Sequence, residues 1–110
     1  MTAAENKYIP VIDIFAGPGG LGEGFSAFRT AGMYPFRIRL SAEKDANAWE
    51  TLRLRSFFRQ FRANGLRVPD EYYAHVTEPK SYTLDDLFKA FPAEAKAASE
   101  EAQCLELGEA

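Results

Sequence analysis

The chain is poor in cysteine and histidine, with Cys104 and His75 as the single examples among 110 residues. One cysteine excludes an internal disulfide, and scarce cysteine is typical of proteins from a reducing compartment. His75, in the stretch YYAHV, has no second histidine or cysteine at the spacing of metal ligands, so the sequence predicts no metal site. We therefore expect a cytoplasmic protein whose chemistry uses neither a disulfide nor a bound metal ion.

Long apolar runs are also absent. No segment approaches the roughly 20 consecutive apolar residues that a membrane-spanning helix needs. The first ten residues, MTAAENKYIP, contain no basic segment followed by an apolar one, so they do not read as a secretory signal. The composition, 46% hydrophobic and 14% aromatic, is that of a globular protein with one compact domain. We expect no membrane partner.

No strong net charge points to one class of partner, because the formal value is only −3. The charge is nevertheless uneven, with +4 over residues 1–67 and −7 over residues 68–110. The basic first part could face phosphate groups. Its later arginines are expected instead to form a solvated helix face, because no aromatic residues alternate with them for base stacking. They are Arg53, Arg55, Arg59, Arg62 and Arg67. The late glutamates are read in the same way, and they are Glu94, Glu100, Glu101, Glu106 and Glu109.

Apolar periodicity predicts two strand–helix pairs at the start of the chain. The stretch YIPVIDIF, residues 8–15, has the nearly continuous apolar character of a strand in a parallel sheet. A short helix over residues 21–32, a strand over 35–43 and a longer helix from about 46 to about 64 follow. The expected apolar faces of the two helices are Leu21, Phe25 and Phe28, and Leu54, Phe57 and Phe61. This order is typical of an α/β protein with a parallel sheet.

The signal is weaker after residue 65. Residues 66–82, with two prolines, read as a loop. Thr83, followed three residues later by Asp86, predicts the start of a helix that Pro92 ends. Residues 93–106 are rich in alanine and glutamate and have high helix propensity. We expect this part of the chain to continue the same domain as a loop and helices.

Five of the eight glycines fall between residues 17 and 24, directly after the first expected strand. Glycines weaken a fold unless the backbone must bend sharply or a ligand must lie against it. GPGGLG, residues 17–22, satisfies the pattern G-x-G-x-x-G of nucleotide-binding turns, and no Gly-Lys-Ser or Gly-Lys-Thr of a P-loop follows. Glu43 ends the second expected strand, where an acid can accept hydrogen bonds from both ribose hydroxyls of a nucleotide. On spacing alone, dinucleotide and S-adenosylmethionine sites both remain open.

The residues around the glycines distinguish between these ligands. DIFAGPGGLGEGF, residues 13–25, resembles the first motif of the DNA cytosine-5 methyltransferases, an Asp, an apolar residue and then Phe-Ala-Gly-x-Gly-Gly. SAEKD, residues 41–45, is similar to their second motif, an acid that closes a strand and another acid two positions later. The resemblance implies a Rossmann-like S-adenosylmethionine-dependent methyltransferase fold. It also implies transfer of a methyl group to C5 of cytosine in DNA, by an enzyme of the restriction–modification type.

The same resemblance assigns an S-adenosylmethionine site residue by residue. Phe15 would pack against the adenine, Glu43 would hold the ribose hydroxyls, and Asp13 would order the loop or meet the amino group. The loop itself would face the methionine part, through Ala16, Gly17, Gly19, Gly20 and Leu21. Lys44 departs from the family's pattern, since many relatives carry an apolar or aromatic residue under the adenine. Its aliphatic stem could still cover the edge of the ring.

Several motifs of the family have no counterpart in the chain. The family's nucleophile is the cysteine of a Pro-Cys motif, which attacks C6 of a flipped-out cytosine. Cys104 stands in AQCLE, without an adjacent proline and in a segment expected to be helical rather than at the end of a strand. The Glu-Asn-Val motif, the Gln-x-Arg-x-Arg motif and the DNA-recognition region are also missing. The sequence therefore predicts no catalytic residue.

The resulting interpretation divides the chain into two parts. Residues 1–65 are expected to form the S-adenosylmethionine-binding strand–helix–strand–helix segment of an incomplete fold. Residues 66–110 are expected to be its loop and helical continuation, truncated before the catalytic motif. DNA is the expected partner, through the remainder of the enzyme. Two alternatives remain open: a dinucleotide-binding fragment of an oxidoreductase, and a small non-enzymatic α/β interaction module.

Few elements after residue 65 could cover both faces of a parallel sheet. We therefore expect exposed apolar surface around Trp49, Phe57, Phe58 and Phe61. Such a surface would favour self-association or the binding of a complementing chain.

The missing Pro-Cys motif leads to a prediction about activity. C5 of cytosine becomes nucleophilic only after a thiolate has added to C6 of a flipped base. We expect the 110-residue chain alone to transfer no methyl group to mixed-sequence DNA, and Cys104→Ser to have no effect in a completed enzyme. A labelled-methyl transfer assay with a trap for covalent DNA adducts measures this. Transfer by the chain alone that is lost in Cys104→Ser would contradict the assignment.

Overall fold

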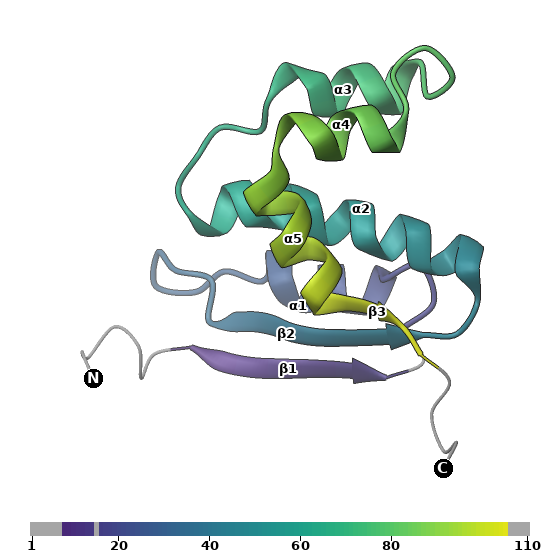
Figure 1. Cartoon of the computed structure of the whole chain (residues 1–110). Helices are drawn as coiled ribbons and strands as arrows, with labels where there is room; N and C mark the ends of the chain where they lie inside the picture. Colours follow the sequence, from purple (N-terminus) through teal and green to yellow (C-terminus); the bar gives the residue numbers. More distant parts are fainter. Residues whose placement is uncertain (1–7, 15, 106–110) are drawn as a thin grey trace.

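The computed structural model describes residues 8–14 and 16–105, and it is an α/β structure (Figure 1). Its elements are β1 (Ile9–Ile14), α1 (Gly20–Ala27), β2 (Phe36–Glu43), α2 (Ala46–Ala63), α3 (Asp70–Thr77), α4 (Leu84–Ala90), α5 (Pro92–Glu101) and β3 (Ala102–Cys104). The strands form one parallel sheet in the order β1-β2-β3. Helices α1, α2 and α5 lie on one side of this sheet, and α3 and α4 lie beyond α2 (Figure 1). The arrangement is compatible with part of a Rossmann-like fold.

The first four elements confirm the expected strand–helix–strand–helix order and the parallel sheet. Helix α1 is shorter than expected, because Phe28 leaves the helical region with φ −64° and ψ 132°. A tight turn follows, in which Thr30 and Met33 exchange two backbone hydrogen bonds of 2.9 Å. Ala31 and Gly32, between them, both have positive φ, as in the two-residue turns of hairpins. This turn redirects the chain into β2.

The expected loop over residues 66–82 is wrong in part, because α3 forms at Asp70–Thr77. The two prolines of this segment flank the helix instead of interrupting it, and Pro69 is its N-cap residue. Asp70 and Glu71 place negative charge in the first turn, where the helix dipole favours it. His75 has a structural contact, with Nδ1 2.9 Å from the carbonyl oxygen of Tyr82.

The second half differs from expectation at both ends of α5. Pro92 stands at the start of this helix, where a proline without an N–H is tolerated, and the break before it is made by Phe91. The helix expected over residues 93–106 ends at Glu101 instead. Ala102–Cys104 instead pair with β2, with Ala102 opposite Ser41 and Cys104 opposite Glu43. Pairing along a strand edge overrides a local preference for helix in this segment.

The apolar core lies between α2 and the C-terminal helices, which corrects the expected exposed surface. Phe57 and Phe61 are buried, and Phe58 packs against Tyr72 with ring centroids 5.2 Å apart. The Nε1–H of Trp49 donates to the carbonyl oxygen of Ala102 over 2.9 Å. The expectation failed because α3, α4 and α5 cover α2, whereas the sequence had indicated too few elements to do so.

Apolar surface is exposed instead on the other side of the sheet and on α1. The exposed side chains of β1 are Ile9, Ile12 and Ile14, and those of the expected apolar face of α1 are Leu21, Phe25 and Phe28. Phe25 and Phe28 contact Phe36, but each remains at least 40% exposed. In the residues that the structure describes, no helix packs on the outer face of β1 (Figure 1). A parallel sheet usually has cover on both faces, so this face is unusual.

Arg59 is buried, which corrects the expectation of a wholly solvated arginine face. Its guanidinium forms ion pairs with Glu23 of α1 and with Glu101 of α5, so Glu101 is also not the solvated residue that was expected. The Nε2–H of Gln60 donates to the second oxygen of Glu101 over 3.0 Å. Arg62 and Arg67 are exposed, as expected.

The part of the chain that the structure describes holds no helix both long enough and apolar enough to span a bilayer.

Arg59 gives a prediction about stability. Removing one partner of a buried ion pair leaves the other charges without compensation and costs about 3 kcal/mol. We expect Arg59→Met to lower the free energy of unfolding by about this amount, measured by urea titration followed by circular dichroism. The exposed Arg62→Met is the matched control and should change it by less than about 0.5 kcal/mol. Equal stability of the two variants would contradict a structural role for the ion pairs.

Candidate functional site

The glycine-rich turn and Glu43 meet at the carboxyl ends of β1 and β2. Ligands of open α/β sheets bind at this end of the strands, because the turns between strand and helix converge there. The N–H of Ala16 donates to the carbonyl oxygen of Ala42 over 3.0 Å, so the turn is attached to the last residues of β2. The sequence placed these two segments 26 residues apart, and the parallel pairing brings them together.

Glycine is favoured at Gly19 and Gly22 for different reasons. Gly19 has a φ of 95°, and a Cβ there would lie 2.8 Å from Cδ1 of Leu52 on α2. Gly22 has an ordinary φ, but a Cβ would lie 2.8 Å from Cδ1 of Ile38 and 3.2 Å from Oδ2 of Asp13. These glycines therefore allow the start of α1 to approach both the sheet and α2. They have a structural function whether or not a ligand binds.

The N-terminus of α1 carries backbone donors without helical acceptors. The N-cap residue is Gly19, which has no side chain to cap the helix. The first helical hydrogen bond runs from the N–H of Glu23 to the oxygen of Gly19, 2.9 Å away. The N–H groups of Gly20, Leu21 and Gly22 consequently have no acceptor within α1. These N–H groups lie at the N-terminal end of α1, where the helix dipole favours negative charge.

Glu43 is held by two backbone donors. The N–H of Gly17 donates to Oε1 and the N–H of Asp45 donates to Oε2, each over 2.9 Å. These hydrogen bonds, first that of Asp45 and then that of Gly17, lower the pKa of Glu43 below its ordinary value of 4.5. The carboxylate is therefore ionised at neutral pH. Its two oxygens offer about four acceptor positions, so two remain for a further partner.

The two aspartates near the turn have different environments. Oδ2 of Asp13 is buried and has no hydrogen-bond partner among the residues that the structure describes. Few buried acceptors in folded proteins lack a partner, so this atom needs an explanation. Oδ2 of Asp45 accepts from the N–H of Ala48 over 2.8 Å and caps α2. The second acid of SAEKD thus has a structural role that its position in the sequence did not reveal.

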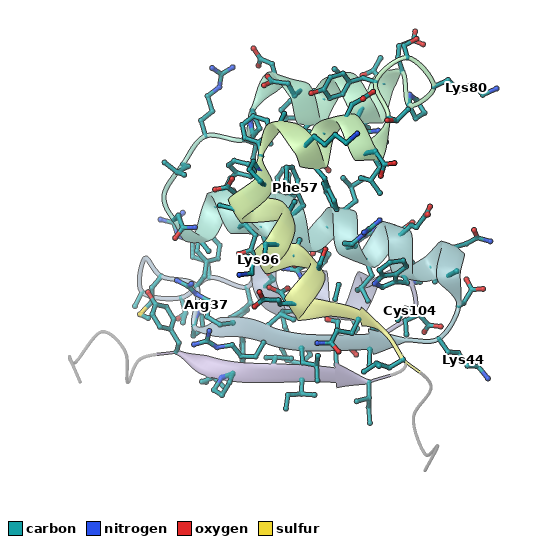
Figure 2. The ribbon with its side chains drawn as sticks, in the orientation of Figure 1. Arg37, Lys44, Phe57, Lys80, Lys96 and Cys104 are labelled. Carbon is teal, nitrogen blue, oxygen red and sulfur yellow. The ribbon has the colours of Figure 1, made fainter. Side chains whose placement is uncertain are left out.

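The remaining residues assigned to the cofactor from the sequence differ in how the structure places them. Gly17 lies in the turn and Gly20 begins α1, and a Cβ added at either position would meet no other atom within 4 Å. Leu21 is 70% exposed, and the side chain of Lys44 extends away from the sheet in Figure 2. Phe15 lies outside the described residues. The roles of these side chains toward a ligand stay predictions.

Cys104 lies beside this site, which sequence reasoning missed. It is the last residue of β3 and stands opposite Glu43, so the expected helical context is wrong. Its Sγ–H donates weakly to the carbonyl oxygen of Lys44, 3.6 Å away, and Figure 2 shows both residues at the same end of the sheet. The N–H of Leu105 donates to the oxygen of Glu43 over 3.0 Å. A strand of three residues after an alanine- and glutamate-rich helix leaves no periodic signal in the sequence.

These donors and acceptors fit S-adenosylmethionine. A ribose diol needs an ionised acceptor at the end of β2, which Glu43 supplies. The ammonium and carboxylate groups of a methionine moiety need an acceptor and N–H donors, which Asp13 and the start of α1 supply.

Sequence comparison gives a similarity to a known enzyme. The chain is 32% identical over 89 residues to the Type II methyltransferase M.Bpa9945I of Bacillus paralicheniformis. This similarity supports a relationship to the methyltransferases. The match covers 74% of this chain but only 18% of the length of that enzyme. No family model matches the chain, and no solved structure matches it significantly.

The hydrogen bonds of Glu43 predict a pH dependence of stability. Because the pKa of Glu43 is lowered by folding, its ionised form stabilises the fold above pH 4.5. This contribution is lost as the pH falls through the lower pKa of the folded state. We expect the stability difference between the wild type and Glu43→Gln to shrink between about pH 7 and about pH 3, measured by urea titration.

The control for this measurement is Glu78→Gln, which removes an exposed carboxylate far from the turn. Its difference from the wild type should show no comparable dependence on pH. A Glu43→Gln difference that stays constant over the same range would show that the carboxylate does not hold the turn.

Proposed function

We propose that the chain is the S-adenosylmethionine-binding part of a DNA cytosine-5 methyltransferase of the restriction–modification type. The observation that carries the proposal is the ionised carboxylate of Glu43 at the glycine-rich turn, hydrogen-bonded to the N–H of Gly17. The similarity to a Type II methyltransferase supports the same reaction class. The residues DIFAGPGGLGEGF and SAEKD are the basis for cytosine C5 as the acceptor.

In this proposal the residues of the chain bind and orient the methyl donor. Glu43 accepts hydrogen bonds from the two ribose hydroxyls through its remaining acceptor positions. Asp13 accepts from the amino group of the methionine part, which satisfies its buried Oδ2. The N–H groups at the start of α1 donate to the methionine carboxylate. Phe15 and the stem of Lys44 cover the adenine. The bound cofactor supplies an activated methyl group.

The chain contributes no nucleophile in this proposal. Attack on C6 of cytosine needs a thiolate beside the flipped base. Cys104 has no preceding proline, and its Sγ–H contacts the carbonyl oxygen of Lys44. The thiolate and the DNA contacts would therefore come from other parts of a whole enzyme.

We further propose that a complementing polypeptide covers the free side of β1. The outer edge of β1 has no strand beside it in the described part of the chain, and its isoleucines are exposed. Exposed strand edges and apolar patches are typical places for the addition of a strand from a partner. A second copy of this chain could pair with the same strand edge and cover the same isoleucines.

The test measures the binding of S-adenosylhomocysteine and related ligands to the wild type and two variants by calorimetry. If Glu43 holds the ribose hydroxyls, Glu43→Ala should weaken binding of S-adenosylhomocysteine by about 1.5–3 kcal/mol. The wild type should also prefer S-adenosylhomocysteine over its 2′-deoxy analogue, and Glu43→Ala should lose this preference. The distant Glu78→Ala is the control and should bind as the wild type does.

The 2′-deoxy analogue distinguishes a direct contact between Glu43 and the ribose from damage to the turn. A variant that binds both ligands more weakly but keeps the preference would show that Glu43 acts on the turn alone. Binding of NAD in place of S-adenosylhomocysteine would favour the oxidoreductase alternative. Binding of neither S-adenosylhomocysteine nor NAD would favour a non-enzymatic interaction module.

A further inference from the structure

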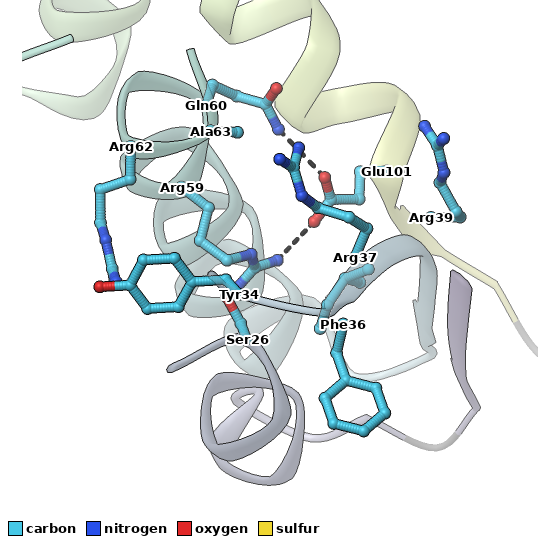
Figure 3. Close-up of a pocket in the computed structure, with 11 residues that line it drawn as sticks. Ser26, Tyr34, Phe36, Arg37, Arg39, Arg59, Gln60, Arg62, Ala63 and Glu101 are labelled. Carbon is cyan, nitrogen blue, oxygen red and sulfur yellow. Dashed lines mark hydrogen bonds and ion pairs between the residues drawn. The ribbon is translucent and has the colours of Figure 1, made fainter. Parts of the chain in front are cut away.

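A second pocket lies at the opposite end of β2 from Glu43. It has a volume of about 170 Å³ and is bounded by α1, α2, α5 and the first half of β2 (Figure 3). Its polar lining consists mainly of arginines from β2 and α2, with Ser26 and Tyr34 at the side of α1. This pocket is separate from the glycine-rich turn, and none of its residues was assigned a ligand from the sequence.

Positive charge exceeds negative charge in this pocket. Its arginines are Arg37, Arg39, Arg59 and Arg62, and its acid is Glu101. Glu101 is already occupied, because it pairs with Arg59 and accepts from Gln60 (Figure 3). The described part of the chain provides no salt bridge for Arg37, Arg39 or Arg62. Within residues 8–14 and 16–105, three guanidinium groups thus line one pocket without a paired carboxylate.

Two of these arginines are held in position by aromatic rings. The guanidinium of Arg37 lies 4.0 Å from the ring centroid of Tyr8, and that of Arg62 lies 5.0 Å from that of Tyr34. A guanidinium stacked on a ring keeps its N–H donors free at the edge of its plane. The stacking therefore orders the side chains without using the groups that would bind an anion. Arg39, the residue of β2 that the pairing with β1 passes over, also lines the pocket and adds a third set of donors.

A neighbouring open hollow shares Arg39 and Glu101 with the pocket and adds Glu100. The carboxylate of Glu100 has its own partner, because it lies 4.0 Å from Nζ of Lys96. The acids nearby therefore leave the excess of positive charge in place.

We propose that this pocket binds a phosphate group. The four arginines and the two carboxylates that pair with Arg59 together carry a net charge of +2, which attracts an anion of charge −2 or more. Arginine binds phosphate through paired N–H donors, and the hydroxyls of Ser26 and Tyr34 provide further donors. The volume exceeds that of about five water molecules, so a phosphate group fits with part of the molecule that carries it. The group belongs either to a small phosphorylated molecule or to a nucleic-acid backbone.

The proposal is tested by binding of pyrophosphate and of a short mixed-sequence DNA duplex to the 110-residue chain. We expect pyrophosphate to bind, and the double variant Arg39→Gln/Arg62→Gln to weaken it about tenfold or more. Both residues are exposed, so circular dichroism should show an unchanged fold. Arg67→Gln is the control, since it removes one positive charge at an exposed position outside the pocket, and should change affinity less than about twofold.

The duplex identifies the source of the phosphate. If the source is DNA, the duplex binds, and the double variant reduces the slope of log affinity against log salt concentration by about two. If pyrophosphate binds and the duplex does not, the pocket takes a small phosphorylated molecule. The Arg39→Lys/Arg62→Lys variant should restore part of the affinity, because it keeps the charge but not the paired donors. No binding of either probe, or equal losses in the double variant and in Arg67→Gln, would overturn the proposal.

Discussion

The rest of the structure depends on the buried guanidinium of Arg59. It joins Glu23 of α1 to Glu101 of α5 across α2, so three helices from distant parts of the chain are held at one point. Glu23 lies in the first turn of α1, directly after the glycine-rich turn, and Glu101 is the last residue before β3. A single side chain therefore fixes the position of both segments that border the candidate cofactor site. A buried charge is tolerated here because two carboxylates compensate it.

The sequence predicted the first half of the fold well and the second half poorly, and the reason is physical. Residues 8–65 carry strong periodic signals, because their strands and the core face of α2 have regular apolar spacing. The strand Ala102–Cys104 carries no such signal, since its pairing with β2 decides its conformation. The prolines at positions 69 and 92 are ambiguous signals, because a proline can either end a helix or stand at the start of one. Burial of Arg59 was invisible, because its two partners lie 36 and 42 residues away.

The candidate site could be predicted in its residues but not in all of its contacts. Motif spacing located Glu43, Asp13 and the glycines, and the parallel pairing of β1 and β2 explains why they meet. It did not show that Asp45 caps α2, that a Cβ at Gly19 would meet Leu52, or that Cys104 ends a strand beside Glu43. These features depend on which element packs against the turn. A sequence pattern describes the turn and its own helix, but α2 and β3 approach it from elsewhere in the chain.

The hydrogen bond between Gly17 and Glu43 has a consequence for the rate at which the turn can bind. Glycine-rich segments have more conformations to lose than others, and a ligand that must order them binds weakly and slowly. Here the carboxylate of Glu43 holds the first glycine at 2.9 Å, and α2 restricts Gly19 before any ligand arrives. The turn is preorganised by the same carboxylate that would contact the ligand. Association should then need little rearrangement of the backbone, so that differences in affinity between ligands arise mainly in their dissociation rates.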